Sequence, residues 1–158
     1  MRTVDHAELP QYLSAMVFST SVILLSLTVP LQLQAVDLPG PPKGYYALRI
    51  HPDPDFVCVR VYWFNAEILT VQYHVDCGQD YHDSEPIVLD EPRVDSFTVD
   101  GGSMVKYNDF IRVARQKCGA LIQIADDDLK SLTYNRAPNT LSVMFGGAGV
   151  LRPGDCYD

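Results

Sequence analysis

Two neighbouring stretches of the chain alternate between apolar and polar side chains, and this pattern constrains the fold more than any other feature. Residues 56–64 and 69–77 both have this period, with a short polar turn at 65–67 between them. A period of two indicates a β-strand, and two such segments around a short turn predict an antiparallel hairpin. One face is wholly apolar and has to be covered. The other face is mixed and carries Cys58, Arg60, Tyr62, Phe64, Thr70, Gln72, His74 and Asp76.

Shorter elements are predicted around this hairpin. Further strands are expected at 45–50, 87–89, 94–99, 120–125, 129–134 and 140–145. Asn108 is a suitable helix N-cap and Gly119 a suitable residue just past a helix C-terminus, which predicts a helix between them. We expect 78–86 and 146–158 to be loop and coil. The predicted class is α+β, with an antiparallel sheet of about five or six strands and one packed helix.

Residues 16–35 have the layout of a secretory signal peptide. An apolar run from Val22 to Val29 ends at Pro30, and Ala35 offers a small residue for cleavage. This predicts a leader and signal peptide at 1–35, a Pro/Gly-rich linker at 36–44 and a single secreted domain at 45–158. Contact with a membrane would then be transient. Met16 is an alternative start, and an uncleaved anchor or a buried core helix are alternatives to cleavage, although the apolar part is shorter than the roughly 20 residues of a membrane span.

The four cysteines lie far apart in the sequence. Structural zinc sites favour closely spaced pairs, so this spacing favours two disulfides in an oxidising compartment. Cys77 lies on the apolar hairpin face, which the predicted helix with Cys118 should cover. Cys58 lies on the opposite face and is free to meet Cys156. We therefore expect the pairs Cys77–Cys118 and Cys58–Cys156.

The charge of the chain disfavours nucleic acid as a partner. Its formal net charge is −8, whereas binding to a phosphate backbone depends on clustered Lys and Arg. A metal site would need the His and Asp residues between 74 and 83, but His and Asp are common in loops without binding a metal. No metal and no cofactor are predicted.

The mixed hairpin face is the best candidate for catalysis. If the turn centres near Asn65 and Ala66, Arg60 should lie close to Gln72, with Tyr62 and His74 nearby. An imidazole as general acid or base and an arginine for a phosphate would suit a small secreted ribonuclease-like hydrolase. The sequence places no carboxylate beside them, so we predict no catalytic residues; Arg60, Tyr62 and His74 remain the alternative site.

The nine tyrosines favour a recognition surface, because tyrosine buries a large area at a low cost in entropy. With its signal peptide, acidic domain and four cysteines, the chain resembles the small secreted effector-like proteins of plant-associated fungi. That resemblance implies a virulence-related, non-catalytic interaction protein that engages host or other extracellular proteins. A secreted hydrolase is the alternative.

Overall fold

The computed structural model describes residues 40, 42–51, 56–65, 67, 69–78 and 80–158. They belong to one unit that runs from Val36 to Asp158. The expected signal peptide and most of the expected linker lie outside the described residues.

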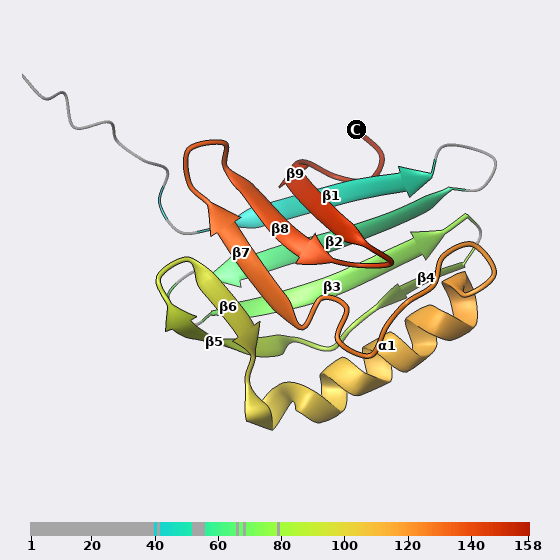
Figure 1. Cartoon of the computed structure of the whole chain (residues 1–158), viewed down its shortest axis with the longest axis horizontal. Coiled ribbons are helices and arrows are strands. Elements are labelled where there is room, and N and C mark those ends of the chain that lie inside the picture. The colour runs from blue at the N-terminus through green and yellow to red at the C-terminus, as the bar shows by residue number, and fades with distance from the viewer. Residues whose placement is uncertain (1–39, 41, 52–55, 66, 68, 79) are drawn as a thin grey trace, which may run out of the picture. The chain divides into compact units, whose positions relative to one another are not determined.

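The described part of the chain forms nine strands, one α-helix and one short 3₁₀ helix (Figure 1). The strands are β1 (Gly44–His51), β2 (Val57–Asn65), β3 (Thr70–Cys77), β4 (Asp80–Asp83), β5 (Ile87–Arg93), β6 (Ser96–Val99), β7 (Ser131–Asn135), β8 (Thr140–Met144) and β9 (Ala148–Pro153). The helices are η1 (Gly101–Ser103) and α1 (Met104–Cys118).

Eight of the strands close into an antiparallel barrel. The sheet order is β2-β1-β9-β8-β7-β6-β5-β3-β4, and β2 also pairs with β3. That second pairing joins the two ends of the series, while β4 remains outside the ring as an addition to β3. Closure removes sheet edges that would otherwise expose unpaired backbone groups.

The predicted α+β class is therefore wrong: the described domain is mostly β, with more strands than expected and a single helix. Two segments expected to be loop or coil account for part of the difference. The polar stretch 78–86 contains β4, which pairs with the end of β3. The glycine-rich stretch 146–158 contains β9, which pairs with both β8 and β1 and so closes the ring.

The helix and one expected strand also differ from the prediction. Helix α1 begins at Met104, so Asn108 lies inside it, whereas Gly119 is at its C-terminal cap as expected. Residues 120–125 form no strand, because Leu121 and Ile122 continue from the helix through turns that bond to the Cys118 carbonyl. Ile122 and Ile124 are buried, so the apolar pattern there reflects a loop anchored on the core.

The apolar hairpin face points into the barrel, where Val57, Val59, Val61 and Trp63 are almost fully buried. Two tyrosines tie the core to the loop before β7. The Tyr73 hydroxyl donates to the Leu129 carbonyl at 2.9 Å, and the Tyr107 hydroxyl of α1 donates to the Asp128 carbonyl at 2.7 Å. Burial raises the pKa of both phenols.

Two disulfides, Cys58–Cys156 and Cys77–Cys118, are present, in the pairing expected from strand alternation. Cys77–Cys118 joins the end of β3 to the end of α1 on the inner side. Cys58–Cys156 holds the segment after β9 against the outer face of β2. Disulfides of this kind are compatible with an extracellular protein.

Candidate functional site

The outer face of the β2–β3 hairpin brings the predicted site residues together. Arg60 is paired with His74, and Tyr62 with Gln72. The expected register, with Arg60 beside Gln72, is wrong by one pair on this face. Strand β2 extends to Asn65 and β3 begins only at Thr70, so the turn is centred later in the sequence than Asn65 and Ala66, and the pairs on this face move by one.

Arg60 contacts a carboxylate and an aromatic ring, while its Nε atom is buried without a hydrogen bond in the described protein. Its guanidinium Nη1 lies 2.7 Å from both carboxylate oxygens of Asp155, and its Cζ lies 5.0 Å from the centre of the Tyr45 ring. Asp155 belongs to the segment after β9 that Cys156 ties to β2. A phosphate would therefore have to displace a charge-assisted bond that a nearby covalent link holds in place.

His74 and Asp76 are buried on the same face. The Nδ1 atom of His74 lies 2.8 Å from Asp83 Oδ1, and its Nε2 is buried without a hydrogen bond in the described protein. The Tyr157 hydroxyl donates a short hydrogen bond to Asp76. This hydrogen bond is the largest cause, and burial the second, of a rise in the pKa of Tyr157 to about 12.

The structure thus places three carboxylates beside Arg60 and His74. Strand alternation had put Asp76 on this face, whereas sequence reasoning did not place Asp83 and Asp155 there. Each one is already bound: Asp155 to Arg60, Asp83 to His74, and Asp76 to Tyr157. General acid–base catalysis needs a group within reach of a proton on the substrate. The free imidazole nitrogen of His74 is instead buried. As described, these groups form a structural polar cluster under the segment 154–158.

Exposed aromatic rings lie beside this cluster, across β1 and β2. Tyr45 stacks on Tyr62 with ring centres 4.4 Å apart, and Phe64 meets Tyr62 edge-on at 4.6 Å. Tyr45 is 45% exposed and Phe64 44% exposed. We call Tyr45, Tyr62 and Phe64 the aromatic platform. Sequence alternation places Tyr62 and Phe64 on one face, but the addition of Tyr45 depends on the pairing of β1 with β2.

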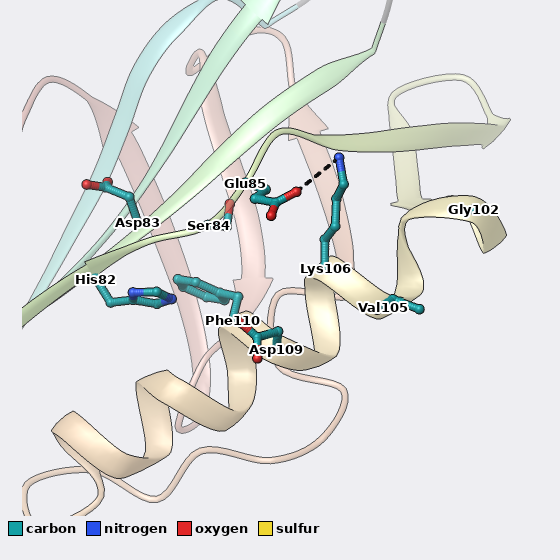
Figure 2. A pocket seen from close by; sticks show the side chains of 9 residues that line it. All are labelled: His82, Asp83, Ser84, Glu85, Gly102, Val105, Lys106, Asp109 and Phe110. Atoms are coloured by element: carbon teal, nitrogen blue, oxygen red, sulfur yellow. Dashed lines mark ion pairs between the residues drawn. The ribbon is translucent and has the colours of Figure 1, made fainter.

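A separate groove lies between β4 and the first half of α1 (Figure 2). Its volume is about 610 Å³, and its lining includes His82, Asp83 and Glu85 from the strand side and Lys106 and Asp109 from the helix. Sequence reasoning missed this groove, because it placed 78–86 in a loop.

The two histidines near position 80 do not converge on one site. His74 faces outward toward Asp83, whereas His82 stacks on Phe110 of α1 at 5.8 Å. Burial lowers the pKa of His82. Among the described residues, no group of three or more His, Cys, Asp or Glu side chains is arranged to hold a metal ion.

No protein-family model, curated protein or solved structure matches the chain. In the part of the chain that the structure describes, no helix has the length and apolar character needed to cross a bilayer.

Proposed function

We propose that the chain is a secreted, non-catalytic interaction protein that binds a host or other extracellular protein through the aromatic platform. One observation carries this proposal: three contacting aromatic side chains lie on the surface of a closed barrel, with Tyr45 and Phe64 about half exposed on either side of the partly buried Tyr62. Tyrosine and arginine are enriched at the energetic centres of protein interfaces. A contiguous exposed aromatic patch marks an interaction site more often than a random surface.

The scaffold suits such a surface, because binding to a rigid platform loses little conformational entropy. Tyr45 and Tyr62 stand on paired strands, and Arg60 is fixed beneath Tyr45. The Cys58–Cys156 bond restrains the neighbouring segment. The platform is therefore pre-organised before a partner arrives.

Secretion is part of the proposal. The signal-like sequence at 16–35 and the two disulfides support it. N-terminal sequencing of protein recovered from culture medium should begin at Val36 or within a few residues. An intact leader in the membrane fraction would contradict secretion and favour an anchor.

The binding test compares a substitution in the aromatic platform with one at an exposed position elsewhere on the barrel. Partners from the extracellular fluid of the host are first captured by cross-linking, then purified and titrated directly. Tyr62→Ala should weaken binding about 10- to 100-fold, as truncation of an interface hot spot does. Met144→Ala, at an exposed position on β8, should leave the affinity unchanged. Equal affinity of the Tyr62→Ala variant and the wild type would refute the platform.

The hydrolase alternative has its own test. Purified protein should not cleave RNA even at high concentration, because Arg60 and His74 are held by carboxylates. Cleavage that disappears in His74→Ala would replace the binding proposal with the hydrolase.

A further inference from the structure

Strand β4 has a strand on one side only. It pairs with β3, and no described strand lies along its other side. The Ser84 N–H donates to the Tyr73 carbonyl at 2.8 Å in the same register. Because hydrogen bonding alternates along an antiparallel strand, His82 also faces β3. The N–H and C=O groups of Tyr81 and Asp83 therefore point to the free edge.

Within the part of the chain that the structure describes, the equivalent edge of β5 is covered but that of β4 is not. The Val88 N–H donates to the Ser103 Oγ at 2.9 Å, and the Val88 carbonyl accepts from the Asp100 N–H at 3.0 Å. No hydrogen bond within the described residues uses the outward backbone groups of Tyr81 or Asp83. An uncovered edge is a template for one more strand.

The groove of about 610 Å³ lies beside this edge and gives an added strand a place to sit. Figure 2 shows His82 and Phe110 side by side between the strand and the helix, with Val105 and Lys106 nearer the start of α1. The partly exposed His82 ring, which stacks on the buried Phe110, and the exposed Val105 provide apolar surface for an alternate side chain of the added strand. The volume is within the usual range of ligand sites.

Charge indicates what kind of strand fits. The groove is lined by the carboxylates of Asp83, Glu85 and Asp109, against the single lining ammonium of Lys106. Outside the lining, His74 contacts Asp83 and Arg112 pairs with Asp109, which offsets part of this negative charge. Lys106 lies 3.5 Å from Glu85, and both side chains are largely exposed, so this ion pair is weak and easily exchanged. A partner rich in Lys or Arg would complement the excess of negative charge.

We propose that the groove between β4 and α1 binds an extended, basic segment of a partner protein, which pairs with the free edge of β4 as an additional strand. Backbone hydrogen bonds to Tyr81 and Asp83 supply the docking, and the carboxylates select basic side chains. This surface is separate from the aromatic platform, so the inference stands or falls independently of the proposed function.

Synthetic peptides test the mode of binding. The probe is a blocked octapeptide of alternating Lys and Val, titrated at low salt into ¹⁵N-labelled protein. Amide shifts should be confined to residues 80–86 and the first half of α1. The same peptide N-methylated at alternate residues keeps its charge but loses the donors that would face β4, and should bind at least tenfold more weakly. Equal binding of both peptides, or no binding of the unmodified one, would overturn the proposal.

Protein variants test the site from the other side. Tyr81→Pro removes an outward N–H that β3 does not use, and it should weaken binding of the unmodified peptide at least tenfold. Tyr81→Thr keeps that N–H, and this variant should bind the peptide with the affinity of the wild type. Asp109→Asn should weaken binding about threefold, an effect that added salt reduces. Tyr62→Ala should bind the peptide normally. Unchanged affinity in both Tyr81→Pro and Asp109→Asn would refute the groove.

Discussion

Removing the Cys58–Cys156 disulfide should cost this domain a large part of its stability. The bond closes a loop with a sequence separation of 98 residues, for which the chain-entropy relation gives ~4.7 kcal/mol at 25 °C. The inner Cys77–Cys118 bond lies within this loop and already closes a segment with a sequence separation of 41 residues. The effective loop is then about 57 residues, which corresponds to ~4.2 kcal/mol.

Replacing Cys58 and Cys156 together with alanine should therefore lower the free energy of unfolding by about 4 kcal/mol. In a domain of this size that corresponds to a drop in Tm of roughly 12–20 °C. Guanidinium unfolding monitored by the fluorescence of Trp63 gives the free energy, and calorimetry gives the Tm. The matched control replaces Cys77 and Cys118, whose loop corresponds to ~3.9 kcal/mol in the same relation.

The size of the loss tests the reasoning. A loss below about 2 kcal/mol for the Cys58/Cys156 variant, with the control near 4, would refute it. That result would mean that the unfolded chain gains little freedom when the outer bond is absent. Hydrogen exchange adds a local check, because the backbone around Asp155 should lose protection while β9 keeps its pairing with β8.

Two further predictions concern the loops and the groove. Burial lowers the pKa of His82, so the unfolded chain takes up a proton more readily than the folded protein as the pH falls below about 6.5. The contribution of His82 to stability should therefore decrease below that pH and stay level above it. His82→Phe should reduce the dependence of Tm on pH between pH 7 and 5, and an unchanged dependence would contradict this. Gly146 has φ +62°, and a Cβ there would lie 2.2 Å from Ile122 Cδ1, so Gly146→Ala should cost about 1–3 kcal/mol in denaturant unfolding. Gly101→Ala, which meets open space, is the control, and equal losses in the two variants would rule out the steric explanation.

Strong periodicity made part of the fold predictable. The hairpin of β2 and β3 follows from alternation over eight or nine residues, and its faces gave the partner of each cysteine. Short or glycine-containing strands carry too few side chains for such a pattern. Strand β4 has four residues, and β9 includes Gly149, whose lack of a side chain admits Leu48. Barrel closure depends on the pairing of strands distant in sequence, which no local pattern reveals.

The candidate site was predictable only where it lies on the hairpin. Alternation placed Arg60, Tyr62 and His74 on one face, and the structure keeps them there. The carboxylates that bind Arg60 and His74 come from the segment after β9 and from β4, both of which were expected to be coil or loop. Their positions depend on long-range contacts rather than on spacing in the sequence.

The opposite orientation of neighbouring side chains on β3 also limits which disulfides the paired hairpin can form. Cys58 is paired with Asp76, so the next residue, Cys77, points to the other side of the sheet. Cys58 and Cys77 are the first two of the four cysteines in the sequence. Once the hairpin forms, their Cβ atoms cannot approach for a bond without breaking the ladder. The paired hairpin therefore excludes a Cys58–Cys77 bond and leaves each of these thiols for the partner that it has in the structure.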